Sequence, residues 1–208
     1  SPVHLNRILR NAGYIALREE QGLELLDAGA SRAFAVSDHQ IAHVYCPDQS
    51  VIEAVKTLLA QTPGVAKVLS GEELAAYRID HPRAGDLVLI AESDAWFTYY
   101  YWLDDKKAPD FARCVDIFKK PGYDPVEMFM DPKNPLIKLR AAYKLARKLA
   151  GFRYRMDVIP LDANLVKGSH GSPLCQEEYY PLFIADYQAT DKMEPTEVYS
   201  LIWNTVFE

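Results

Sequence analysis

The chain of 208 residues lacks the features that mark several classes of protein. It has only three cysteines, an odd number far apart in the sequence with no CxxC pair, which argues against a disulfide framework and a zinc finger. They are Cys46, Cys114 and Cys175, and we expect reduced thiols. No apolar run approaches the length of a bilayer span, so no membrane partner is expected. The net charge of -6 argues against broad binding to nucleic acid.

Several catalytic signatures are also missing. The sequence contains no Walker loop, no G-x-G-x-x-G, no H-E-x-x-H and no G-x-S-x-G. Its start, Ser1 to His4, shows neither the charged region nor the apolar region of a signal peptide, and it has no methionine, which fits a fragment or a processed product. The unpaired cysteines favour the cytoplasm. Localisation is otherwise open, because any signal would lie upstream of Ser1.

What is present indicates an α/β protein. Nearly half of the residues are hydrophobic and a quarter are charged, which is the balance of one globular domain, or of one domain with a smaller one. Residues 5–12 predict a short amphipathic helix that ends at Gly13. Residues 40–91 predict strand, helix, strand, helix, strand, with Asp48 and Ser70 as caps of the two helices. These residues should form a compact α/β subdomain.

The second half of the chain has a different composition. Residues 93–135 are rich in aromatic residues, aspartate and proline, which indicates ordered irregular structure or a long excursion. The aromatic run 96–102 could stack a base or a sugar, but without neighbouring cations we favour packing within the fold. Residues 135–150 predict a helix, and a C-terminal helix should begin near Pro195.

The most suggestive stretch for chemistry runs from Lys167 to Gly171. It places His170 between two glycines, Gly168 and Gly171. Glycine allows a close approach of the backbone to a ligand, and imidazole is the commonest metal ligand near neutral pH. An apolar run over residues 156–161 precedes it, and function in open α/β sheets usually lies in loops beyond strand ends. The alternative is a glycine turn whose histidine only faces water.

A second candidate is the pair Asp38-His39 together with His43. The spacing His-x-x-x-His places two ligands on one ion only in a helix, whereas the surroundings here are those of a strand. Four strand residues span about 13 Å, too far for two ligands of one ion. We therefore favour a polar strand face or strand end, and keep Asp38, His39 and His43 only as alternative metal ligands.

A run of cations follows Lys133, with no acidic residue between Asp131 and Asp157. Such a patch could steer a phosphate-bearing substrate. We prefer the alternative, a solvated face that balances the acidic stretch before it.

Five stretches together resemble the type I phosphodiesterase/nucleotide pyrophosphatase family of the alkaline phosphatase superfamily. The first is similar to the helix and strand that follow the family's second metal motif, and the second to its D-W-S-x-T-R-A-Y-A segment, from which Gly29 and its neighbours depart. The third resembles an R-x-G-D stretch that enters a late strand, the fourth the final metal-ligand motif, and the fifth the closing helix. In order, they are residues 4–14, 27–35, 81–88, 168–171 and 195–199.

The resemblance implies the C-terminal part of an alkaline-phosphatase-like α/β sandwich. Residues 1–39 and 136–208 would belong to its core, with 40–92 as a small α/β subdomain and 93–135 as the excursion. It implies two divalent metal ions, usually zinc, with His170 as the last ligand of one site. The nucleophile and the other ligands would lie upstream of Ser1, so that no catalytic residue is expected in this chain.

The implied substrate is a small phosphate ester or nucleotide, hydrolysed by a two-metal mechanism at a phosphodiester or pyrophosphate bond. The N-terminal part of the same protein would then be a partner of this chain, which alone should be inactive. Two alternatives stay open. One is a non-catalytic α/β binding or interaction module, and the other is a phosphonate hydrolase, mutase or sulfatase-like member of the same superfamily.

Overall fold

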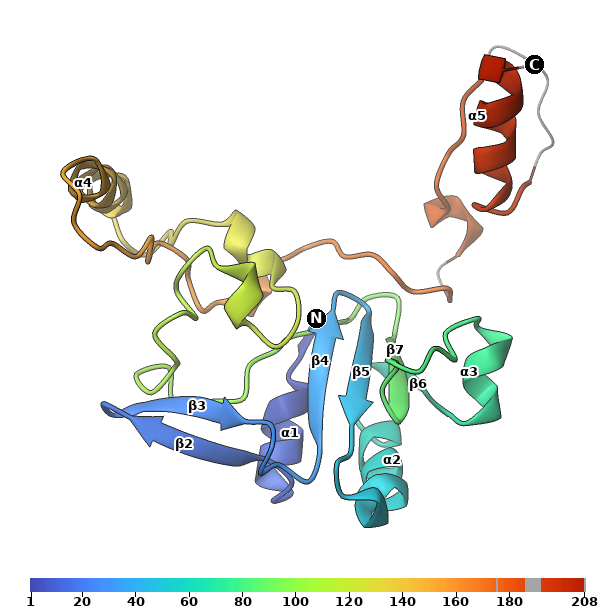
Figure 1. The fold of residues 1–208 in the computed structure, drawn as a ribbon, viewed down its shortest axis with the longest axis horizontal. Coiled ribbons are helices and arrows are strands. Elements are labelled where there is room, and N and C mark those ends of the chain that lie inside the picture. The colour runs from blue at the N-terminus through green and yellow to red at the C-terminus, as the bar shows by residue number, and fades with distance from the viewer. Residues whose placement is uncertain (175, 186–191, 208) are drawn as a thin grey trace. The chain divides into compact units, whose positions relative to one another are not determined.

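The computed structural model describes residues 1–174, 176–185 and 192–207, which divide into two compact units, residues 1–174 and 175–208. Figure 1 shows the elements. The α-helices are α1 (Leu5–Asn11), α2 (Ile52–Ala60), α3 (Glu72–Ala76), α4 (Ile137–Leu149) and α5 (Glu197–Phe207). The strands are β1 (Pro2–Val3), β2 (Ala16–Glu20), β3 (Leu23–Asp27), β4 (Phe34–Asp38), β5 (Ile41–Tyr45), β6 (Val65–Ser70), β7 (Leu87–Ala91) and β8 (Trp96–Phe97). Short 3-10 helices are η1 (Gln49–Val51), η2 (Ile117–Lys119), η3 (Pro125–Met128), η4 (Ala163–Leu165) and η5 (Glu177–Tyr179).

The main sheet has four strands in the order β4-β5-β7-β6, and every neighbouring pair in it is antiparallel. A parallel pair, β1 and β8, and an antiparallel hairpin of β2 and β3 complete the strands of the described chain. The expected α/β class is confirmed. The predicted boundary between residues 39 and 40 falls in the β4–β5 turn, and the division into core, subdomain and excursion stays a prediction.

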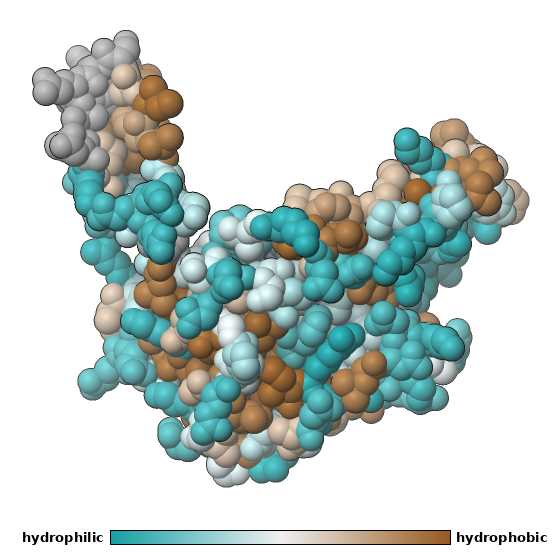
Figure 2. All heavy atoms as spheres, turned by 180° about the vertical axis from the view of Figure 1, so that it is seen from behind, coloured by the Kyte–Doolittle hydropathy of each residue, from teal (hydrophilic) through white to brown (hydrophobic). Residues whose placement is uncertain are grey.

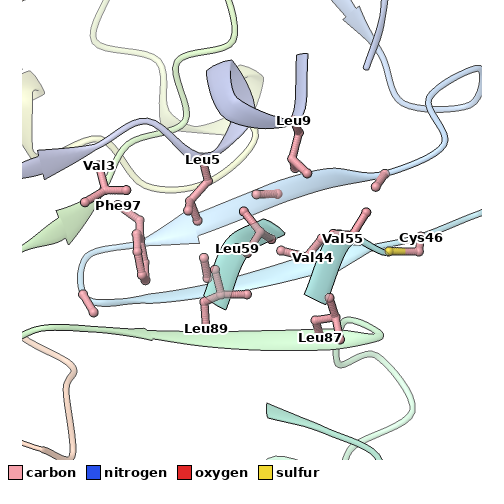
Figure 3. Packing of buried hydrophobic residues seen from close by; sticks show 14 of the residues in the cluster. Val3, Leu5, Leu9, Val44, Cys46, Val55, Leu59, Leu87, Leu89 and Phe97 are labelled. Carbon is pink, nitrogen blue, oxygen red and sulfur yellow. The ribbon is translucent and has the colours of Figure 1, made fainter. Parts of the chain in front are cut away.

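One face of the main sheet carries the hydrophobic core of the first unit (Figure 3). Leu5 and Leu9 of α1 and Val55 and Leu59 of α2 are fully buried, because residues three or four apart share one face of a helix. Alternate strand residues meet them, since successive strand side chains point to opposite faces. These strand residues are Ala35, Ala42, Val44, Leu87 and Leu89. Burial of each leucine stabilises the fold by about 1.5–3 kcal/mol.

The opposite face of the sheet has a smaller core. Val88 and Ile90 of β7 pack there with Leu69 of β6 and Leu74 of α3. Strand β7 is therefore buried on both faces, which explains its uninterrupted apolar sequence.

The aromatic run packs inside the first unit, as favoured from the sequence. Tyr99, Tyr100, Tyr101 and Trp102 are each no more than 1% exposed. The rings of Tyr100 and Trp102 stack with centroids 4.6 Å apart. The Trp102 ring also meets the rings of Tyr99 and Tyr101 edge to face. Residues 93–135 contain little regular structure, yet this aromatic cluster gives them a core, which they share with Ile159, Ala163 and Val166.

The two predicted caps differ in outcome. The Asp48 carboxylate accepts a hydrogen bond from Ser50 N at 3.0 Å and so caps η1, which leads directly into α2. The prediction for Ser70 is wrong, because α3 begins one residue later, with Gly71 at its N-cap and no side-chain cap. The Ser70 hydroxyl instead accepts a hydrogen bond from Lys56 Nζ at 2.7 Å, while the Ser70 N–H donates to the Glu73 carboxylate.

Helix α4 directs charged side chains towards the rest of its unit. Arg140 and Lys144 both pair with the Asp157 carboxylate, whereas Lys138 and Lys148 are exposed, so the basic run is partly paired and partly solvated. Leu139 and Leu149, in contrast, are 66% and 89% exposed. Uncovered apolar side chains of this kind are brown in Figure 2.

The remaining expectations concern the termini and the cysteines. In the second unit α5 begins two residues after Pro195, close to the predicted position. Cys46 and Cys114 are free and buried, whereas Cys175 lies outside the described residues. Burial raises the pKa of the Cys46 thiol to about 11. Within the described ranges no helix has the length and apolarity needed to cross a membrane.

Candidate functional site

The loop that carries His170 lies against the turn between β4 and β5. Strand pairing continues to Asp38 and Ile41, which leaves His39 and Gln40 as a two-residue hairpin loop. The backbone N–H of Gln40 donates to the carbonyl oxygen of His170 at 3.1 Å. The Gln40 side chain donates in turn to three backbone carbonyls of residues 92–95. The hairpin turn is therefore a fixed platform for the glycine-flanked loop.

His39 connects the turn and the loop through its side chain. Its ring centroid lies 3.9 Å from that of His170, with an interplanar angle of 32°. Tyr123 stacks at 4.8 Å from the same ring. The Nδ1 atom of His39 lies 3.2 Å from the Ser169 hydroxyl, within hydrogen-bond distance. The structure thus brings His39 and His170, 131 positions apart in the sequence, into direct ring contact.

A glycine places Tyr123 in this cluster. Gly122 pairs with Ser37 of β4 in an isolated parallel bridge, and Tyr123 N donates to Ser37 O at 2.8 Å. A Cβ atom at Gly122 would lie 2.1 Å from Ser37 O, and the backbone there has a φ of +120°. Only glycine fits at this approach.

Buried charges fix the segment that follows Gly122. The Lys120 ammonium lies 3.3 Å from Asp124 and 2.5 Å from Glu127, and the three side chains are at most 7% exposed. Burial raises the pKa of the Asp124 carboxyl, and the neighbouring Lys120 opposes that shift. Removal of the cation would leave two buried carboxylates uncompensated, so this segment depends on Lys120.

Electrostatics around the turn favour a neutral His39. Burial lowers its pKa, the nearby His170 lowers it further, and Asp38 opposes both effects. The Asp38 carboxylate itself is exposed.

His43 takes part in different contacts. Its Nδ1 accepts a hydrogen bond from Gly85 N at 3.0 Å, and its ring stacks near Tyr45. Burial lowers the pKa of His43.

The residues of the site fit a metal ion only in part. His170 is exposed, and among the described residues no group donates to or accepts from its ring nitrogens. A protein zinc site needs about three protein ligands. Across residues 1–174, 176–185 and 192–207, no three His, Cys, Asp or Glu side chains are grouped to hold a metal ion. The described chain can therefore offer single ligands, but no complete metal centre.

Two further features of the site were not predicted from the sequence. Tyr123 and Ser169 both contact His39, from segments that are far from it in the sequence. The Pro121-Gly122 pair was visible only as a chain breaker, with nothing to indicate its partner strand.

These observations define an α/β protein that presents a loop histidine at the turn of an antiparallel sheet. The sequence matches the model of the family described as "Type I phosphodiesterase / nucleotide pyrophosphatase" over residues 1–124, more than half of the chain. The chain therefore belongs to this family, and the resemblance inferred from the sequence is confirmed. No curated protein matches the chain.

One solved structure is similar to part of the chain. It is a phosphonoacetate hydrolase from Sinorhizobium meliloti 1021, solved in complex with phosphonoacetate. The identity is 21% and the TM-score 0.32, over 47% of this chain and 23% of that chain. The matched part of this chain thus covers about a quarter of the length of that hydrolase.

Proposed function

We propose that this chain is part of a metal-dependent phosphodiesterase or nucleotide pyrophosphatase and supplies one metal ligand, His170. The family match over residues 1–124 supports the class of reaction. The observation that carries the role of His170 is its exposed imidazole, whose ring nitrogens have no partner among the described residues. An imidazole without a competing hydrogen bond is free to bind an ion.

The proposed centre would hold two divalent ions, zinc in the usual case, and these would supply stabilisation of the attacking and leaving oxygens at phosphorus. This chain's own contribution is to present the ligand. Gln40 N–H fixes the backbone of His170, and the glycines on either side let the loop approach a bound phosphoryl group. The substrate is a small phosphate ester or nucleotide.

We infer that the nucleophile and the other ligands lie outside these 208 residues. A zinc centre needs about three protein ligands, and the described residues hold no group of three His, Cys, Asp or Glu side chains that could bind one ion. They would come from the N-terminal part of the same protein.

The test compares this chain with a protein extended upstream in its gene. Both are washed with chelator, dialysed against zinc, and analysed for bound metal by mass spectrometry and for hydrolysis of a chromogenic phosphodiester. We expect tightly bound zinc and hydrolysis only in the longer protein, and we expect His170→Ala to abolish both. His81→Ala, at an exposed histidine, is the matched control and should change neither.

Two results would contradict the proposal. Stoichiometric metal and turnover in the 208-residue chain would mean that its ligands have been missed, and Asp38, His39 and His43 would be examined first. Full activity of the longer protein after His170→Ala would remove His170 from the metal centre. A phosphonate or a sulfate ester as the preferred substrate would keep the metal centre but replace the reaction.

A further inference from the structure

We propose that His39 is a positioning residue, which holds the imidazole of His170 in one orientation. Its consequence, that a metal-binding nitrogen is held in one direction, rests on the proposed function. The contact itself is a property of this chain. It joins the first loop of the main sheet to the glycine-flanked loop 168–171.

The backbone of His39 indicates that its side chain is needed where it lies. His39 has a φ of +55°, whereas Gln40 is not among the residues with positive φ. A two-residue hairpin loop with positive φ only at its first position favours glycine there. A non-glycine residue in a sparsely populated conformation is unfavourable and persists only when its surroundings determine it. Here the surroundings are the rings of Tyr123 and His170 and the hydroxyl of Ser169.

The distance between the two rings indicates that His39 supports His170 and does not share a metal ion with it. Two imidazoles bound to one tetrahedral zinc ion through nitrogens about 2.0–2.1 Å away have ring centres about 5 Å apart. The centroids of His39 and His170 are 3.9 Å apart, too close for that geometry. The Nδ1 of His39 is also engaged by the Ser169 hydroxyl. His39 therefore acts on His170 by packing.

The support matters because little else among the described residues fixes the ring of His170. Glycine on both sides gives the backbone freedom, and the Gln40 N–H holds only the carbonyl group of His170. A ligand must be held close to its productive geometry by neighbours that are themselves fixed. His39 satisfies this requirement because it is buried, and Tyr123 and Ser169 lie against its ring.

The test uses the metal-free 208-residue chain with 13C- and 15N-labelled histidine, followed by NMR. In the wild type we expect nuclear Overhauser contacts between the rings of His39 and His170, a ring-current shift of the His170 ring protons, and relaxation typical of an ordered side chain. His39→Ala should remove the ring-current shift and make the His170 side chain mobile. His39→Phe retains a flat ring against His170, so it should restore the order of His170 although Nδ1 is lost.

His81→Ala is the control and should leave the His170 signals unchanged, because His81 lies on an exposed loop. Backbone amide spectra verify that each variant is folded, and His39→Phe keeps the test informative if His39→Ala unfolds. Unchanged His170 signals in a folded His39→Ala would overturn the proposal. So would equal mobility of His170 in His39→Ala and His39→Phe.

The readout separates the two proposals because it needs neither metal nor turnover. If the ring contact is observed but zinc leaves the His170 signals of the longer protein unmoved, the positioning role stands and the proposed metal centre fails. If His39→Ala releases His170 and also lowers kcat of the longer protein, with His39→Phe recovering it, both proposals are supported.

Discussion

Replacement of Gly122 by alanine tests the contact that places Tyr123 against His39. The added Cβ would lie 2.1 Å from Ser37 O and 2.7 Å from Ser37 N, both in the backbone of β4. A backbone atom in a paired strand cannot move aside without loss of pairing. Residue 122 also has a φ of +120°, which an L-residue rarely adopts.

The expected magnitude follows from these two effects. An unfavourable backbone conformation costs about 1–3 kcal/mol. A forced overlap in a packed region costs a further 1–3 kcal/mol or so. We therefore expect Gly122→Ala to lower the free energy of unfolding of the first unit by roughly 2–6 kcal/mol, a large part of the 5–15 kcal/mol that is typical of a domain.

Urea unfolding followed by tryptophan fluorescence measures this loss. Trp96 and Trp102 report on the first unit, and Trp203→Phe removes the signal of the second. The matched control is Gly13→Ala, because Gly13 has a φ of +80° but nothing within 4 Å of its Cβ position. It should show only the conformational cost, about 1–3 kcal/mol. Equal losses in the two variants would refute the close approach of residue 122 to β4.

Three further predictions concern buried groups. Lys120→Met should lower stability by about 3–5 kcal/mol in the same assay, because two buried carboxylates lose their cation. The control, Lys119→Met at an exposed site, should change stability by less than about 0.5 kcal/mol. Burial lowers the pKa of His4 to about 4, so the unfolded chain binds the extra proton first as the pH falls. Stability should be independent of this group above pH 6.5 and should fall by about 3 kcal/mol between pH 6.5 and 4, with a smaller slope in His4→Gln. The Cys46 thiol, with its pKa near 11, should resist a thiol reagent at pH 8 until the protein unfolds, and rapid labelling of the native protein would contradict its burial.

Local patterns predicted the elements whose signals lie within a few residues. The helix over residues 5–12 and the strand at 86–91 were found because periodicity, a glycine stop and an apolar run are all local. Ser70 was wrongly predicted as the cap of α3 because its side chain has a different partner. Its hydroxyl bonds Lys56, which is adjacent only in the folded chain.

The site could be predicted only in pieces. The motif around His170 stood out by composition, and strand spacing argued against a joint role of His39 and His43 in binding one ion. The contact between His39 and His170 could not be foreseen, because it depends on how residue 170 returns to a turn formed 131 positions earlier. No local pattern in the sequence carries that information.

Unfavourable local features gather along one line of contacts that ends at His170. Lys120 and its carboxylates are buried charges, Gly122 approaches β4 as only glycine can, and His39 has a left-handed backbone conformation. Each would be avoided in a sequence selected for stability alone, since apolar substitutes and a glycine turn would be less costly. Proteins retain such features where function requires them. Their concentration beside an exposed imidazole supports the proposal that the loop 168–171 is a functional element.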